Sequence, residues 1–185
     1  MIPVLHLIVC GARASAETVR AVEFAHRSGF TICVVTTPTA LAFIGDTAQL
    51  AHLTGRPVET RLEIDPAEAR PSPDAVLVSP LTFNTLNKWA LGINDNLAVG
   101  LLHDALGLGV PITAVPWLNS ELASHPAARR SLDLLKGAGV AFTAGYGHPS
   151  SRRAGIDGST APIPYPWQEI EDHLQRMFEV VTMRG

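Results

Sequence analysis

Hydroxyl and amide side chains crowd one stretch in the middle of the chain, Ser79–Leu97 (SPLTFNTLNKWALGINDNL). The stretch follows Asp74–Val78 (DAVLV), whose four consecutive apolar residues predict a buried strand that Pro80 ends. Its polar side chains then fall in a loop that opens a helix: Thr82, Asn84, Thr85 and Asn87. Ligands of open α/β sheets bind beyond the carboxyl ends of the strands. The pattern therefore predicts a binding site in this loop.

Two earlier loops also follow predicted strands, at Gly11–Ser15 and at Thr36-Thr37. Both precede predicted helices, and helix N-termini attract phosphate through free N–H groups and the macrodipole. Arg13 and Ser15 could contact such a ligand directly, or Ser15 could only cap its helix while Arg13 is solvated. The glycine patterns of the dinucleotide-binding fingerprint and of the P-loop are both absent from the sequence.

A fourth predicted strand end carries Pro116–Asn119 (PWLN). The Asn119 amide could bind a ligand or cap the following helix, and without further context capping is favoured.

Cys10 lies in an apolar run, which favours a buried structural thiol over a nucleophile. The seven histidines show no metal-ligand spacing, so no metal site is predicted. Trp89 and Trp167 are interpreted as packing or interface residues.

Predicted strands and helices alternate along most of the chain. The strands are expected at Val4–Cys10, Thr31–Thr36, Val58–Ile64, Asp74–Ser79, Pro111–Val115 and Val140–Thr143. Helices are expected from an N-cap at Ser15 to Gly29, from Pro38 through Phe43, and over Thr47–Leu53, Asn84–Ala90, Asp95–Leu108, Pro126–Leu135 and Ile170–Val181. This alternation predicts an α/β fold, a Rossmann-like (flavodoxin-like) three-layer sandwich with a parallel sheet. Residues 144–166, rich in Gly, Ser and Pro, are expected to form a long loop.

Length and composition indicate one domain over residues 1–185, with a core of about 4–143 followed by the loop and C-terminal helix of 144–185. The 185 residues carry a net charge of −3, without a basic run that would bind nucleic acid or an anionic membrane. We also expect no signal peptide, because Met1–Cys10 lacks a charged start and a cleavage pattern, and no membrane helix, because no apolar run approaches about 18 residues. A reducing cytoplasm is then the default location, with both cysteines inside apolar runs.

Several segments together resemble the homo-oligomeric flavin-containing cysteine decarboxylases. Pro80–Thr85 (PLTFNT) is similar to the P-A-S-A-N-T motif of that family, and Lys88–Leu97 is similar to its K-x-x-x-G-I-A-D-[DN]-L motif. Val115–Leu122 resembles its P-x-M-N-x-x-M segment, and His125-Pro126 follows where the family often has the same pair. The family includes phosphopantothenoylcysteine decarboxylase and the peptidyl-cysteine decarboxylases of lantibiotic synthesis.

The resemblance implies an FMN cofactor, a small thiol or peptide substrate, and a homo-trimer or a multiple of trimers. It implies that the flavin lies partly across a subunit boundary, with Asn119 on the substrate side as the candidate catalytic residue. The implied cofactor-binding residues are Gly11, Ala12, Arg13, Ser15, Thr36, Thr37, Thr82, Phe83, Asn84 and Thr85.

The sequence departs from the family on the substrate side. The histidine that the decarboxylases place about fourteen residues before the motif proline corresponds here to Pro66, and the two methionines correspond to Leu118 and Leu122. Since a general base contributes roughly 10²–10⁴ in rate, we expect a flavin-dependent lyase or oxidoreductase reaction other than the standard decarboxylation. Three alternatives stay open: a decarboxylase whose base is His52 or Glu68, a non-catalytic regulatory subunit, and, ranked last, a flavin prenyltransferase-like enzyme.

Overall fold

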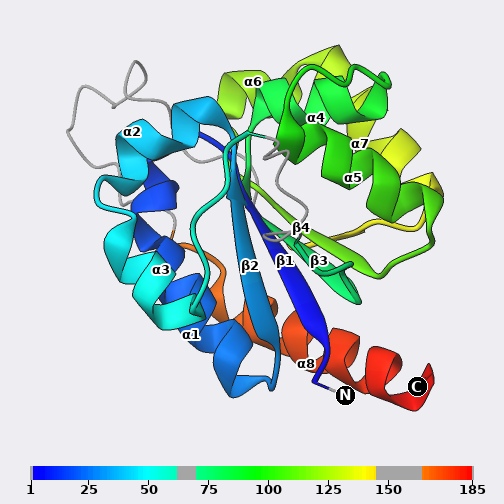
Figure 1. The fold of residues 1–185 in the computed structure, drawn as a ribbon. Coiled ribbons are helices and arrows are strands. Elements are labelled where there is room, and N and C mark those ends of the chain that lie inside the picture. The colour runs from blue at the N-terminus through cyan, green and yellow to red at the C-terminus, as the bar shows by residue number, and fades with distance from the viewer. Residues whose placement is uncertain (1, 62–69, 145–163, 185) are drawn as a thin grey trace.

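The computed structural model describes residues 2–61, 70–144 and 164–184. Five strands form one parallel sheet in the order β2-β1-β3-β4-β5, as Figure 1 shows. Their bounds are β1 Val4–Val9, β2 Thr31–Thr36, β3 Ala75–Leu81, β4 Ile112–Pro116 and β5 Ala141–Phe142. The predicted α/β fold with a parallel sheet is confirmed. All of β3 and β4, and all but the first residue of β1 and β2, are buried, which explains their continuous apolar runs.

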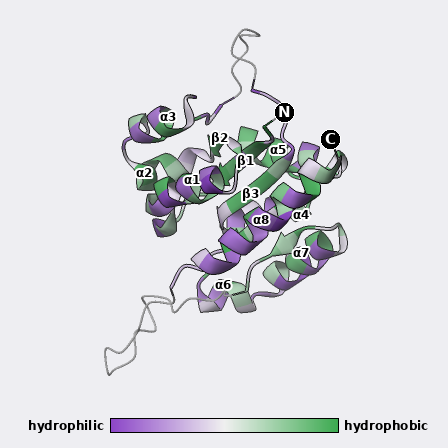
Figure 2. Ribbon diagram, turned by 90° about the horizontal axis from the view of Figure 1, so that it is seen from below, coloured by the Kyte–Doolittle hydropathy of each residue, from purple (hydrophilic) through white to green (hydrophobic). Residues whose placement is uncertain are grey.

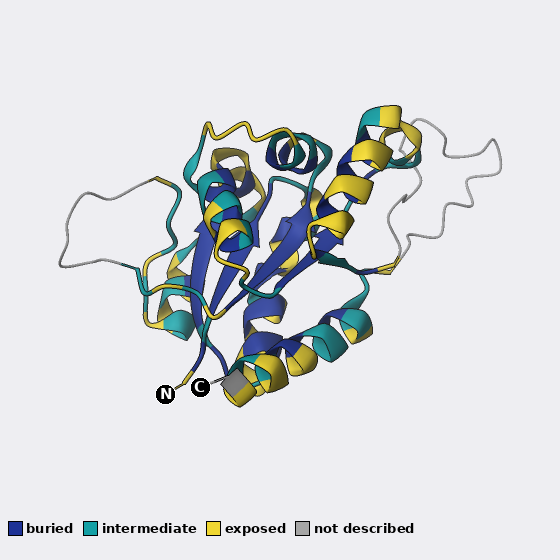
Figure 3. Ribbon diagram, turned by 90° about the vertical axis from the view of Figure 1, so that its right-hand side faces the viewer, coloured by how far each residue is buried: buried dark blue, intermediate teal, exposed yellow. Residues whose placement is uncertain are grey.

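Helices cover both faces of the sheet. One apolar core joins it to α1 (Thr18–Arg27), α3 (Ala48–Thr54) and α8 (Trp167–Arg184). The other joins it to α4 (Phe83–Ala90), α5 (Leu97–Gly107) and α7 (Pro126–Gly137). The shorter elements are η1 (Arg13–Glu17), η2 (Pro38–Ala40), α2 (Leu41–Ile44) and α6 (Ser120–Ser124). Figure 2 shows apolar strands between helices of mixed hydropathy, and Figure 3 shows the buried sheet beneath helices with exposed outer faces.

Two predicted strands differ from the structure. The strand before the central motif does not end at Pro80, because β3 continues to Leu81 through an irregularity in its pairing with β4. Proline fits there because the carbonyl oxygens still pair: that of Pro80 accepts the N–H of Cys10 at 3.2 Å, and that of Leu81 accepts the N–H of Trp117 at 2.8 Å. Of the strand expected at 58–64, the described residues contain only an isolated bridge between Val35 and Glu59.

Ser15 does not cap a helix as expected. It is fully buried inside η1, where its Oγ donates to the carbonyl of Cys10 at 2.7 Å and accepts the N–H of Ala12 at 3.1 Å. These two bonds hold the first loop against the end of β1. Pro66 and Glu68, and most of the loop expected at 144–166, lie outside the described residues.

Candidate functional site

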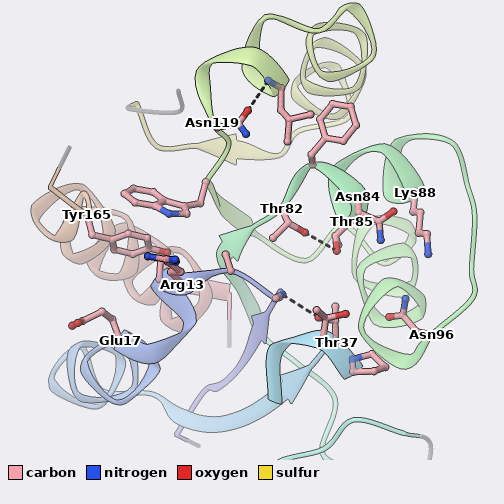
Figure 4. Close-up of a pocket in the computed structure, with 18 of the residues that line it drawn as sticks. Arg13, Glu17, Thr37, Thr82, Asn84, Thr85, Lys88, Asn96, Asn119 and Tyr165 are labelled. Carbon is pink, nitrogen blue, oxygen red and sulfur yellow. Dashed lines mark hydrogen bonds between the residues drawn. The ribbon is translucent and has the colours of Figure 1, made fainter. Parts of the chain in front are cut away.

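A cleft of about 1080 Å³ opens at the carboxyl ends of β1 to β4. In the sheet, β2 and β3 lie on opposite sides of β1. The loop that follows β1 and the loop that follows β3 therefore turn away from each other, which opens a space between them. Figure 4 shows the lining side chains arranged around the resulting space. Most of the predicted ligand residues line it: Gly11, Ala12, Arg13, Thr37, Thr82, Phe83, Asn84, Thr85 and Asn119.

Two predicted site residues do not line the cleft. Ser15 lies behind the first loop, as described above. Thr36 is buried at the end of β2, and its hydroxyl lies 2.8 Å from that of Thr60. Both residues therefore hold loops in place, whereas the neighbouring Thr37 lines the cleft.

Gly11 brings the first two loops close together. A Cβ atom at this position would lie 2.7 Å from Thr39 Cβ and 2.9 Å from the Thr39 backbone carbon, closer than real Cβ contacts. The N–H of Gly11 donates to Thr37 Oγ1 at 3.2 Å, and the N–H of Thr37 donates to the carbonyl of Val9 at 2.9 Å. The loop after β1 and the start of η2 thus form one continuous wall.

The N-terminus of α4 forms the facing wall. Its N-cap residue, Thr82, makes no side-chain cap hydrogen bond, and its hydroxyl instead donates to Thr85 Oγ1 at 3.3 Å. The first N–H groups of the helix therefore lack the usual side-chain acceptor. Asn84 is exposed at this end. We call Gly11, Thr37, Thr82, Asn84 and Thr85 the polar side of the cleft.

Aromatic residues form the other part of the lining. Trp117 follows β4, and Tyr165 precedes α8; their ring centroids lie 4.8 Å apart. Asn119 caps α6 by accepting the N–H of Leu122 at 2.8 Å through Oδ1, which leaves both of its Nδ2 protons for a ligand. Capping and ligand binding, posed as alternatives by the sequence, are thus compatible. We call Trp117, Asn119, Leu122 and Tyr165 the aromatic side of the cleft.

The charges of the cleft are few. Lys88 and Asp95 form an ion pair across the loop between α4 and α5, and the hydrogen bond from Lys88 is the main cause that lowers the pKa of Asp95. Arg13 and Glu17 are exposed on η1.

Beneath the cleft, burial raises the pKa of the Cys10 thiol despite hydrogen bonds from Thr85 and Thr82, so the predicted structural role of this cysteine fits its surroundings.

Tyr165 is the main lining residue that the sequence analysis missed. Its hydroxyl lies 2.8 Å from Ser79 Oγ, and burial raises its pKa more than this hydrogen bond lowers it. It lies in the segment predicted to be an irregular loop. The signal that could have found it is the Tyr165-Pro166-Trp167 cluster at the start of the amphipathic C-terminal helix.

No group of three or more His, Cys, Asp or Glu suited to a metal ion occurs among the described residues. Within the same ranges, the structure contains no helix with the length and hydropathy of a membrane span. His52, a candidate replacement base, is exposed on α3 and does not line the cleft.

A doubly wound parallel sheet with a large cleft at its switch point defines an α/β protein of the class that binds nucleotides and nucleotide-like cofactors. Within this class, a protein-family model described as Flavoprotein matches residues 3–179. The chain belongs to the Flavoprotein family.

Known relatives match the chain in sequence and in structure. The coenzyme A biosynthesis bifunctional protein CoaBC of Thermococcus kodakarensis is 30% identical over 142 residues, which cover 74% of this chain and 35% of that protein. The chain spans less than half the length of the curated relatives it matches. The crystal structure of the FMN-dependent cysteine decarboxylase SpaF superimposes with a TM-score of 0.71 at 22% identity, covering 94% of this chain and 95% of SpaF.

A second structure is that of a PPC decarboxylase mutant complexed with pantothenoylaminoethenethiol. It superimposes with a TM-score of 0.70 at 20% identity, covering 97% of this chain and all of that chain. These likenesses establish the fold that the sequence predicted.

Proposed function

We propose that this protein binds FMN in the cleft and uses it in a reaction on a small thiol or a peptide. The observation that carries the proposal is the polar side of the cleft, where the uncapped N-terminus of α4, threonine hydroxyls and the Asn84 amide lie together at the switch point of the sheet. Membership of the Flavoprotein family supports the same conclusion.

The residues of the polar side fit a phosphorylated flavin. The loop after β1 and the start of η2 would hold the phosphate, because Gly11 lets these two segments approach closely and the hydroxyl-bearing Thr37 and Thr39 line the cleft there. Thr82, Phe83, Asn84 and Thr85 would line the isoalloxazine ring from the start of α4. When bound, FMN supplies a two-electron oxidation of the substrate.

The chain's own residues would bind and orient the substrate. Asn119 would donate a hydrogen bond through Nδ2 while its Oδ1 remains on the N-terminus of α6. The described lining contains no histidine, so we propose a reaction other than the family's standard decarboxylation. An active decarboxylase with another base, or a non-catalytic subunit that binds flavin and a partner, remains the alternative to be tested.

We propose that copies of the chain assemble around the cleft, as a trimer or a multiple of trimers. Exposed apolar side chains adjoin the lining residues: Leu41 and Phe43 on α2, and Leu91 and Ile93 between α4 and α5. A second copy could cover these residues and complete the flavin site. Light scattering of the purified protein tests the assembly, and a monomer would overturn it.

The absorption spectrum tests the cofactor. The purified protein, or the protein after incubation with FMN and gel filtration, should show the flavin absorption band at about 450 nm. A protein that retains no flavin in either preparation would refute the proposal. With flavin-loaded protein, carbon dioxide release from a cysteine-ended peptide or from phosphopantothenoylcysteine would favour the decarboxylase alternative, and turnover of any other thiol would exclude the non-catalytic one.

A further inference from the structure

A second hollow lies at the end of the sheet opposite the cleft. It has two parts, of about 310 Å³ and 250 Å³, which share these lining residues: Pro111 and Ile112 around the start of β4, Gly139 before β5, and Val180 of α8. In Figure 1 the C-terminal end of α8 lies near the N-terminus, at the amino ends of the strands. None of the residues that line the second hollow also lines the cleft.

The larger part of the second hollow is apolar. Every residue that lines it is an aliphatic residue, a glycine or a proline, and Leu106 and Val110 bring side chains from the end of α5 and the turn that follows it. Exposed apolar side chains adjoin this part, since Leu108 lies in the same turn and Met183 lies one helical turn beyond Val180. An apolar group that enters this part therefore gains free energy by leaving water.

The smaller part of the second hollow carries the polar groups. Thr113, His173 and Arg176 line it. Thr113 Oγ1 lies 3.3 Å from His173 Nδ1, and the Nε2 atom of this ring makes no hydrogen bond to a described residue. Burial lowers the pKa of His173, and the charge of Arg176 adds to the shift. At neutral pH Arg176 is therefore the cation of the second hollow.

Arg176 has no counter-ion in the part of the chain that the structure describes. It takes part in none of the ion pairs there, and no acidic residue among those described lines the second hollow. Asp172 and Glu169, whose charges act on His173, already accept hydrogen bonds from a glutamine side chain and a backbone N–H. A guanidinium beside an apolar hollow complements a ligand that has one anionic end.

We propose that the second hollow binds a compact amphipathic carboxylate, with its hydrocarbon chain in the larger part and its carboxylate on Arg176. One molecule can occupy both parts, because they share residues of β4 and α8. His173 donates to the carboxylate through Nε2 in the tautomer whose Nδ1 accepts the hydroxyl proton of Thr113. A single cation beside a neutral imidazole matches a monoanion. This inference does not rest on the proposed function, since the two sites share no lining residue.

The experiment titrates the full-length protein, with and without FMN, by calorimetry. The ligands are octanoate, its neutral amide octanamide, and octylammonium. We expect one octanoate per chain, bound about tenfold to hundredfold more tightly than octanamide, and the weakest binding for octylammonium. Equal affinities for octanoate and octanamide would overturn the inference. Displacement of octanoate by FMN would place it in the cleft and would overturn the inference as well.

Two variants locate the ligand. Arg176→Gln should lower the affinity for octanoate to that for octanamide and leave octanamide unaffected, whereas Arg130→Gln, an equal charge change on the exposed face of α7, should change neither. Val180→Trp should weaken both ligands, because the indole would occupy the space that both parts share; Val180 is 40% exposed, so the fold tolerates the larger side chain. Wild-type affinity for octanoate in either variant would contradict the site.

Two other occupants would give different results. A second copy of the chain would appear as self-association that Val180→Trp abolishes, without saturable binding of octanoate. A lipid surface would appear as binding to phosphatidylglycerol vesicles that octanoate does not inhibit. Either result would overturn the inference. A protein that binds octanoate as expected and takes up no flavin refutes the proposed function alone.

Discussion

The two sides of the cleft are built in different ways. The residues of the polar side follow directly on β1, β2 and β3, so short loops place them. The aromatic side instead joins Trp117, next to β4, to Tyr165, which the chain reaches only just before its last helix. Local sequence thus places the polar side, whereas a contact between segments far apart in the chain forms the aromatic side.

The largest effect is expected where the polar side is tightest. A Gly11→Val substitution would push a side chain into Thr39, so we expect a loss of about 3 kcal/mol in the free energy of unfolding, with FMN binding lost. Gly107→Ala is the control, because a Cβ atom there meets nothing within 4 Å and alanine favours the helix. Urea unfolding and FMN titration measure both; a Gly11→Val variant as stable as the wild type would contradict the tight approach of the two loops.

Lowering the pH should reduce the free energy of unfolding, because His6 is buried in β1 of the sheet that carries both sides of the cleft. Burial lowers the pKa of His6 from 6.5 to about 4, although its hydrogen bond to the carbonyl of Pro71 opposes the shift. The unfolded chain therefore binds the proton more readily, and stability that is complete above pH 6.5 falls toward pH 4. The loss from His6 is up to about 3 kcal/mol. Burial also lowers the pKa of His173, which adds in the same direction.

Urea unfolding between pH 7 and pH 4 measures this dependence. A His6→Gln variant should show a shallower dependence than the wild type, and His52→Gln, at an exposed position of α3, should match the wild type. Equal pH dependence in His6→Gln and the wild type would show that His6 is not held neutral.

A smaller effect separates ligand contact from scaffold within α4. Asn84→Ala should weaken FMN binding by about 0.5–1.5 kcal/mol, because the flavin would lose a hydrogen bond. Asn87→Ala should instead lower stability, since Asn87 donates to the carbonyl of Phe83 at 2.7 Å and accepts from Ser131 at 2.8 Å. Unchanged FMN affinity in Asn84→Ala would place the flavin elsewhere.

The smallest change in FMN affinity is expected from substitutions on the aromatic side of the cleft. Asn119→Ala should leave FMN affinity unchanged, weaken substrate binding, and cost about 1 kcal/mol of stability through the lost N-cap of α6. Asn119→Asp keeps the cap and removes the Nδ2 donor, so it isolates the substrate contact. If Asn119→Asp weakened FMN instead of substrate, the assignment of the two sides would be reversed.

The same contrast explains what the sequence could predict. The strands were predictable because strands buried on both faces read as apolar runs, and the polar side followed because its residues adjoin the strand ends. The sequence could not predict in which direction each hydroxyl points. The Ser15 hydroxyl donates to the backbone and the Thr36 hydroxyl lies beside that of Thr60, whereas Thr37 lines the cleft. Tyr165 was missed because its partner Ser79 is 86 residues away, a tertiary contact without a local signal.

Central to the proposed function is a phosphorylated flavin whose phosphate lies on the polar side of the cleft. The most direct test compares the affinities of the wild-type protein for FMN and for riboflavin by fluorescence titration. We predict stoichiometric binding of FMN, at least about tenfold tighter than riboflavin because charge-assisted hydrogen bonds hold the phosphate. Equal affinities for the two flavins, or no binding of either, would contradict the account.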